Sequence, residues 1–196
     1  MGSNINIDGP GFGITHVYWC GNTEKFRVID EGAFQFAGNY TEFKYFDLPE
    51  NTRIINNNAF AYCYNLAPFD FASTNIYYIG IAAFYCCFNA SGSGYPLLHF
   101  PGSLSSIGQS AFEMIFYNTS GAFRITTLQF GGPGDASQLQ YLGYQAFNML
   151  ERCAIQNVVA YVTSGADTTI FDTTLLDTSN LRGGSSAGVE VSTPIA

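Results

Sequence analysis

A short sequence figure recurs along the chain and limits the architectures that it can form. An aliphatic residue, three variable residues and then Ala-Phe occur five times with the same spacing. Self-similarity at intervals of a few tens of residues is typical of solenoids, in which each repeat buries its apolar side chains against its neighbours. We therefore predict a repeat solenoid. The five copies are Ile29–Phe34, Ile55–Phe60, Ile79–Phe84, Ile107–Phe112 and Leu142–Phe147.

A second figure precedes each copy, and its last copy follows the last Ala-Phe. It consists of three apolar residues separated by two variable residues and then by one. Because side chains alternate across a strand, the last two apolar residues point inward together, and we expect short parallel strands about 4.8 Å apart. The copies are Ile14-Val17-Trp19, Phe43-Phe46-Leu48, Leu66-Phe69-Phe71, Tyr95-Leu98-Phe100, Ile125-Leu128-Phe130 and Ile155-Val158-Ala160.

Together the two figures resemble the BspA-like (Treponema-type) leucine-rich repeats over about residues 14 to 175. The closest matches are Phe46-Asp47-Leu48-Pro49 leading to Ala59-Phe60-Ala61-Tyr62-Cys63, and Phe100-Pro101 leading through Ile107-Gly108 to Ala111-Phe112. The resemblance implies a right-handed leucine-rich-repeat coil. A parallel concave sheet of about six short strands should form one side, and short helical or extended segments should form the convex side.

The repeats also suggest how the core and the ends of the chain are organised. The phenylalanines of the five Ala-Phe pairs should form a stacked spine between repeats. We divide the chain into an N-terminal arm (1–12), a solenoid (13–176) and a C-terminal linker and tail (177–196). Ile170–Leu175 keeps the repeat spacing but ends in Thr-Leu, as a degenerate terminal repeat would. Residues 189–192 alternate like a strand, and they either cap the open end or add to a neighbouring subunit's edge.

The five cysteines do not form a recognisable framework. Their number is odd and no Cys-x-x-Cys pair occurs, so neither a disulfide scaffold nor a zinc site is indicated. Cys63 and Cys87 each lie three residues after the phenylalanine of an Ala-Phe pair. We expect both to be buried, unreactive thiols in adjacent repeats, because free cysteine is among the most buried residue types.

Composition excludes several classes of partner. The net charge is −8, charged residues make up 11% of the chain, and Lys25 and Lys44 are its two lysines. Without a basic patch, binding to nucleic acid or to an anionic membrane surface is disfavoured. No apolar run reaches the roughly 18 residues of a membrane span, so we expect no membrane insertion. The N-terminal residues lack the pattern of a signal peptide.

The exposed positions of the expected strands form the candidate site. They carry aromatic, acidic and amide side chains, which suit a contact surface for a protein or a glycan. Asp47, Asp70 and His99 lie on consecutive repeats and could instead converge on a divalent cation, but a solvated polar surface explains them more simply. We expect no metal site and no cofactor. The candidate residues are His16, Tyr18, Tyr45, Asp47, Asp70, His99, Thr127, Gln129 and Asn157.

Three Gly/Ser-rich insertions lie between repeats, at residues 89–94, 118–121 and 131–137. Insertions in a solenoid map to loops, which either line a functional rim or are tolerated surface segments. Partner contact is expected along the exposed strand positions or these loops. The side that carries the Ala-Phe pairs is not expected to make this contact.

No catalytic motif is present: Gly-x-Ser-x-Gly, His-Glu-x-x-His and the P-loop are all absent from the sequence. We therefore predict a non-catalytic module with no catalytic residues. The resemblance implies a surface-exposed, extracellular recognition or adhesion role. The alternative is a virion structural or decoration protein that self-associates through its end arms, with other copies as its neighbours.

Overall fold

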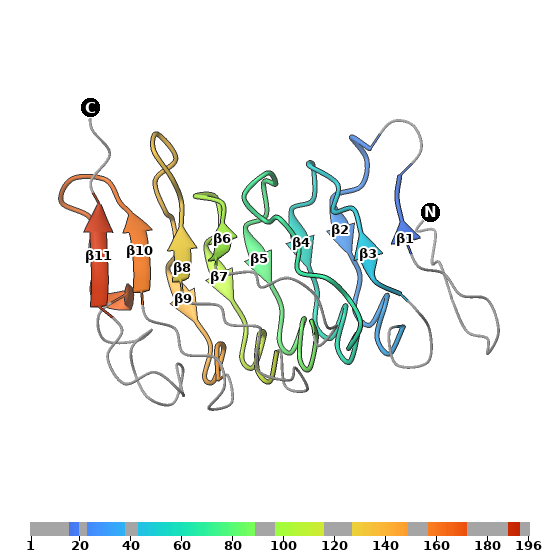
Figure 1. Cartoon of the computed structure of the whole chain (residues 1–196). Coiled ribbons are helices and arrows are strands. Elements are labelled where there is room, and N and C mark those ends of the chain that lie inside the picture. Colours follow the sequence, from blue (N-terminus) through green and yellow to red (C-terminus); the bar gives the residue numbers. More distant parts are fainter. Residues whose placement is uncertain are drawn as a thin grey trace.

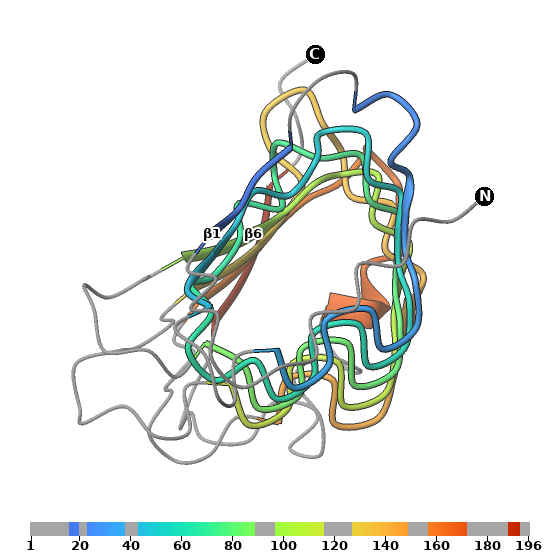
Figure 2. The ribbon, with the colours of Figure 1, turned by 90° about the vertical axis from the view of Figure 1, so that its right-hand side faces the viewer.

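The computed structural model shows a chain that winds repeatedly along nearly one path (Figures 1 and 2). It describes residues 16–19, 23–37, 43–88, 97–115, 127–148 and 157–171, together with the backbone of residues 188–192. We call each turn of the winding a rung. All strand pairings between rungs are parallel, and the predicted repeat solenoid is confirmed.

The strands of the second sequence figure form one side of the solenoid, which we call the ladder side. They are β1 (His16–Val17), β3 (Tyr45–Phe46), β6 (Leu97–Phe100), β8 (Thr127–Phe130) and β10 (Asn157–Tyr161), followed by β11 (Gly188–Ser192). They pair as β1-β3 and as β11-β10-β8-β6. The predicted parallel strands form, but in two sheets and not in one.

The interruption lies at the third copy of the figure, residues 66–71, which contains no strand. The N–H of Ala67 still donates to the carbonyl of Lys44 at 2.7 Å. The next residue is Pro68, which has no N–H and cannot continue such a ladder. The local loss of a donor accounts for the break between β3 and β6.

A second sheet contains the aliphatic residue of every Ala-Phe figure, namely Ile29, Ile55, Ile79, Ile107 and Leu142. The strands pair in the order β2-β4-β5-β7-β9. Short helical or extended segments were expected on the side that carries the Ala-Phe pairs, and this sheet consists of extended segments. Its strands are β2 (Val28–Ile29), β4 (Ile54–Ile55), β5 (Tyr78–Ile79), β7 (Ser106–Ile107) and β9 (Tyr141–Leu142).

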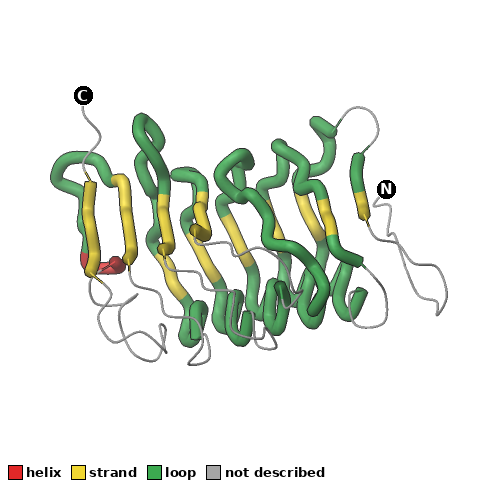
Figure 3. Tube along the Cα trace, viewed as in Figure 1, coloured by secondary structure: helices red, strands yellow, loops and turns green. Residues whose placement is uncertain are grey.

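The Ala-Phe segments themselves are chains of turns. The residue before Ala has a positive φ of 51° to 63° in all five copies, which an α-helix does not permit. The N–H groups bond between rungs: Phe60 donates to the Ala83 carbonyl and Phe84 to the Ala111 carbonyl, both at 2.8 Å. The helical alternative for these segments is therefore wrong. Within the described ranges, helical structure is confined to residues 169–171 (Figure 3).

The predicted phenylalanine spine is confirmed. Consecutive rings lie nearly parallel, with interplanar angles of 4° to 13°. Offset stacking at such distances adds to the stabilisation from burial alone. The centroid distances are 5.1 Å for Phe34–Phe60, 5.3 Å for Phe60–Phe84, 5.1 Å for Phe84–Phe112 and 5.2 Å for Phe112–Phe147.

Glycine follows the aliphatic residue in three rungs because the backbones approach closely there. A Cβ on Gly108 would lie 2.5 Å from the main-chain nitrogen of Ile81, and one on Gly143 would clash with that of Gln109. Real Cβ atoms do not approach backbone this closely. The absence of a side chain at these positions allows the second sheet to stack at its observed spacing.

The thiols of Cys63 and Cys87 occupy the packed positions that the sequence predicted. Both residues are fully buried. Cys63 Sγ donates to the Phe34 carbonyl at 3.0 Å, and Cys87 Sγ donates to the Phe60 carbonyl at 2.8 Å. Burial raises the pKa of the Cys87 thiol well above its usual value, with a further contribution from the neighbouring Cys63 thiol. The Cys87 thiol is therefore held protonated.

The C-terminal strand β11 continues the solenoid. It pairs with β10 over five residues, from Asn157 opposite Gly188 to Tyr161 opposite Ser192. Residues 189–192 therefore belong to the terminal strand of the ladder side. The arm at 1–12, most of the tail and the Thr-Leu end of the degenerate repeat lie outside the described residues.

Candidate functional site

The candidate residues of the ladder side lie on its outer face in the register that the sequence predicts. His16 is opposite Tyr45, Thr127 is opposite Asn157, and His99 is opposite Gln129. The alternate residues, such as Leu98, Leu128 and Val158, are buried. We call the outward-facing set of nine candidate residues the ladder face, and it divides into two groups.

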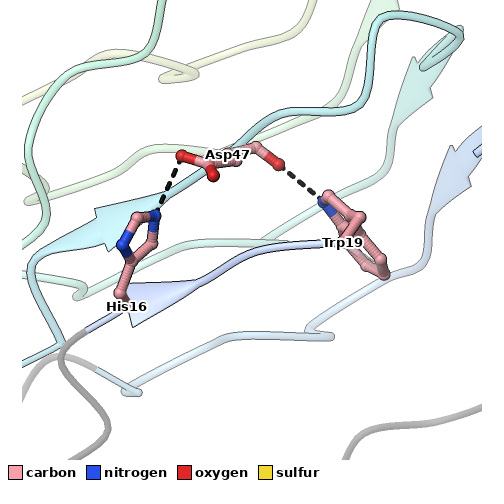
Figure 4. A network of polar contacts seen from close by, with 3 residues as sticks. All are labelled: His16, Trp19 and Asp47. Atoms are coloured by element: carbon pink, nitrogen blue, oxygen red, sulfur yellow. Dashed lines mark hydrogen bonds and ion pairs between the residues drawn. The ribbon is translucent and has the colours of Figure 1, made fainter. Parts of the chain in front are cut away.

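The N-terminal group is an exposed aromatic and acidic cluster. Nε2 of His16 lies 2.9 Å from Oδ1 of Asp47, across the pair β1-β3 (Figure 4). The His16 ring contacts Tyr18 and Tyr45, with centroid distances of 5.6 and 5.7 Å. Trp19 Nε1 donates to the Asp47 carbonyl at 2.6 Å. These contacts hold the cluster in place, while Tyr18 remains 64% exposed and Tyr45 52% exposed.

The C-terminal group is anchored more firmly and is less exposed. Nε2 of His99 lies 2.8 Å from the carbonyl oxygen of Gly131 and 3.0 Å from the amide nitrogen of Gln129. The Gln129 amide donates to the same carbonyl at 3.0 Å. His99 and Gln129 are half-buried. Their polar atoms connect the strands to the loop that begins at Gly131.

A hollow opens on the ladder side where the sheet is interrupted. Its volume is about 350 Å³, at the lower end of the roughly 300–1,000 Å³ typical of ligand pockets. Asp70 follows Pro68 at its edge, and its Oδ1 accepts the N–H of Ala72 at 3.0 Å. The lining residues are Tyr45, Phe46, Asp47, Leu48, Ala67, Pro68, Phe69, Asp70 and Ser73.

Asp47, Asp70 and His99 do not form a common cation site. His99 contacts Gly131 and Gln129 on the C-terminal side of the interruption, whereas Asp47 contacts His16 on the N-terminal side. Across the described ranges, no group of three His, Cys, Asp or Glu residues could hold a metal ion. The cation alternative for these three residues is therefore not supported.

The inserted loop at 131–137 is anchored to both flanking rungs. The N–H of Gly102 donates to Oδ2 of Asp135 at 2.7 Å, and the N–H of Ser137 donates to the Tyr161 carbonyl at 2.6 Å. Gly131 has φ of +72°, which favours glycine there. The loop thus presents a fixed rim beside the C-terminal group. The other two insertions, at 89–94 and 118–121, lie outside the described residues.

Apolar side chains on and beside the second sheet were not singled out from the sequence. Five of them are exposed, and we call this set the second face: Val28, Tyr77, Ile81, Tyr141 and Tyr144. For Val28 and Tyr141, the signal that would have identified them is their position directly before a buried aliphatic residue, since alternation along a strand turns it outward. The second face supplies an internal comparison for any binding assigned to the ladder face.

In the part of the chain that the structure covers, no helix has the length and apolar character to span a membrane. A family model for the BspA-type leucine-rich repeat region matches residues 22–149 in six copies. No curated protein and no solved structure matches the chain significantly.

Proposed function

Because the chain belongs to the BspA-type leucine-rich repeat family, we propose that it recognises another protein with its ladder face. The repeats of this family suggest a protein-binding module. The finer role that we propose is non-catalytic recognition or adhesion at an exposed, extracellular surface. A glycan partner is an alternative ligand for the same face.

The observation that carries the proposal is a pair of exposed tyrosines, Tyr45 in β3 and Tyr18 directly after β1. Tyr18 and Tyr45 project from the segments that Trp19 and His16 tie to Asp47. Tyrosine is enriched at protein interfaces, where its ring provides contact area at a small entropic cost. A surface that is already ordered loses little entropy on binding, which favours affinity.

The polar contacts of the same cluster support a structural role better than a catalytic one. Asp47 bonds to the His16 ring through its side chain and to the Trp19 indole through its main-chain carbonyl, and both contacts join β1 to β3. The side chains are exposed, at 43% for His16 and 61% for Asp47. Such an exposed pair lacks the water-excluded setting that strengthens electrostatic catalysis.

A binding comparison between the two faces tests the proposal. The protein is immobilised, and binding of a panel of purified extracellular-matrix proteins and glycans is measured by surface plasmon resonance. The double substitution Tyr18→Ser/Tyr45→Ser should weaken binding to any partner found by at least about tenfold, because interface aromatics commonly dominate affinity.

The matched control is Tyr141→Ser/Tyr144→Ser on the second face. These tyrosines are 57% and 56% exposed, close to the values for Tyr18 and Tyr45. Both double variants therefore remove two similarly exposed aromatic rings, and they differ in the face from which the rings are removed. The control should change affinity by less than about twofold. Equal losses in the two variants, or intact binding in the ladder variant, would remove the ladder face as the contact surface.

A second candidate function is that of a virion structural or decoration protein. The observation that favours it is β11, a five-residue strand at the outer position of the order β11-β10-β8-β6. Edge strands can pair with a strand of another chain. Light scattering coupled to size-exclusion chromatography separates the candidates: a concentration-dependent multimer supports assembly, and a monomer at all concentrations argues against it.

A further inference from the structure

The lining of the hollow on the ladder side includes apolar side chains and one exposed aromatic ring. Ala67, Pro68 and Phe69 come from the interrupted rung, and Leu48 comes from the rung before it. Tyr45 also lines the hollow and is half exposed. An aliphatic stem can be buried against such apolar side chains while its polar end remains near water.

Two carboxylates line the same hollow. Asp47 uses Oδ1 for the His16 contact at 2.9 Å, and Asp70 uses Oδ1 to accept the N–H of Ala72 at 3.0 Å. No described residue bonds to Oδ2 of either carboxylate. The lining contains no lysine or arginine, although Lys44 precedes Tyr45 in the chain. The hollow is therefore negative in a protein whose net charge is −8.

We propose that this hollow receives the side chain of a lysine or arginine from the partner protein. The inference rests on the proposed binding function of the ladder face and names the chemistry of the contact. The methylene groups lie against the apolar side chains, the cation binds Asp47 and Asp70, and the Tyr45 ring offers a cation–π contact. Tyrosine and arginine are enriched among the residues that contribute most of the binding energy in protein interfaces.

Charge complementarity selects this occupant over the others that fit the volume. A phosphate or an acidic peptide would be repelled by the two carboxylates, and an apolar side chain would offer no donor to their Oδ2 atoms. A neutral sugar could donate hydroxyl hydrogens to the carboxylates but would not depend on their charge. Replacing a carboxylate by the isosteric amide separates the cationic ligand from the sugar.

The test uses short glycine–serine peptides with a central arginine, lysine or citrulline. Citrulline has nearly the shape of arginine without its charge. Each peptide is titrated into the isotopically labelled full chain, and binding is followed through amide chemical shifts. The arginine and lysine peptides should shift resonances of residues 45–48 and 67–73, while the citrulline peptide should bind about fivefold more weakly, as expected for loss of a partly exposed ion pair.

The decisive variant is Asp70→Asn, and the chain provides a matched control in Asp167→Asn. Asp167 Oδ1 accepts the N–H of Thr169 at 2.9 Å, two residues ahead, as Asp70 Oδ1 does from Ala72. Asn retains the accepting oxygen, and both variants remove one negative charge from an exposed turn. Asp70→Asn should weaken the arginine peptide about fivefold, and Asp167→Asn less than about twofold.

Several results would overturn the inference. These are equal weakening by the two Asn variants, equal binding of the citrulline peptide, shifts confined to other residues, and no binding of any peptide. One of these results can occur although Tyr18→Ser/Tyr45→Ser still weakens partner binding more than Tyr141→Ser/Tyr144→Ser does. In that case the cationic ligand is excluded and the proposed function stands. If both experiments fail, the ladder face is not the binding surface.

Discussion

The ladder side and the second sheet are built from the same rungs but differ in continuity. The second sheet runs unbroken through β2, β4, β5, β7 and β9, whereas the ladder side is divided between β3 and β6. Close backbone stacking at Gly80, Gly108 and Gly143 maintains the second sheet. Pro68 interrupts the ladder side by removing a donor.

The difference shows where a repetitive scaffold can acquire a specific site. The unbroken stack repeats the same backbone pairing at every rung, with a buried aliphatic residue at the second position of each strand. At the interruption, a hollow with two carboxylates and a tyrosine appears. Recognition on this chain is therefore expected where the repeat fails, because several different side chains converge there around one concavity.

The largest expected effect is the difference in thiol labelling rate between the folded and the unfolded chain. Cys63 and Cys87 are fully buried beside the spine, and burial raises the pKa of Cys87. Their labelling by an aromatic disulfide reagent should be at least about a thousandfold slower in the folded chain than in urea, because labelling requires unfolding. Peptide mass spectrometry assigns the labelled sites. Fast labelling of either cysteine without denaturant would contradict the packing described for this side.

Removing one ring of the spine should produce the largest change in stability. Phe84 is fully buried and stacks on both Phe60 and Phe112. Phe84→Ala should lower the free energy of unfolding by about 3–5 kcal/mol, measured by urea denaturation. Leu97→Ala on the exposed ladder side is the control and should cost less than about 1 kcal/mol. Similar losses for the two variants would argue against the spine as the main source of stability.

Adding a methyl group at a glycine where two rungs stack closely should destabilise the second sheet, which is the continuous one of the two sides. In Gly108→Ala, the new Cβ would lie 2.5 Å from the main-chain nitrogen of Ile81 and 2.6 Å from the carbonyl carbon of Gly80. Overpacking of this kind should cost about 1–3 kcal/mol in thermal or urea unfolding. The control is Gly132→Ala, where the nearest atom to the added Cβ is His99 Nε2 at 3.9 Å, an ordinary contact. A Gly108→Ala variant as stable as the Gly132→Ala variant would show that the second sheet does not depend on close stacking.

The smallest expected change in stability belongs to the ladder face. Tyr45 and Asp70 are exposed, and Asp70→Asn retains the oxygen that accepts the Ala72 N–H. Tyr45→Ser combined with Asp70→Asn should lower the free energy of unfolding by less than about 1 kcal/mol. A loss comparable to that of Phe84→Ala would mean that these residues serve the fold, and their role in recognition would need another basis.

Much of the fold could be predicted because the apolar period is a strong signal. The spacing of Ala-Phe predicted the stacked rings, and the alternation around Leu98 and Leu128 predicted the register of the ladder side. The second sheet was harder to recognise because its two-residue strands are too short to show alternation. Val28 and Tyr141 could nevertheless have been found, because each directly precedes a buried aliphatic residue.

The candidate site was predicted in part. The sequence placed Tyr18, Tyr45 and Asp47 on one face, and the structure brings them into one cluster with His16. The anchoring of His99 depends on the path of the loop at Gly131, which local sequence does not determine. The sequence predicted a strand at residues 66–71, so the break at Pro68 and the hollow beside it, which also requires the Asp70 turn and the neighbouring rung, were not predicted.

Hydrogen–deuterium exchange of the chain, alone and bound to a partner found in the panel, tests the central claim most directly. Binding should slow exchange in residues 16–19, 45–48 and 67–73, since a bound partner excludes solvent from the ladder face. Exchange in the second sheet, at residues 28–29, 54–55, 78–79, 106–107 and 141–142, should remain unchanged. Protection confined to those second-sheet residues would contradict the assignment of recognition to the ladder face.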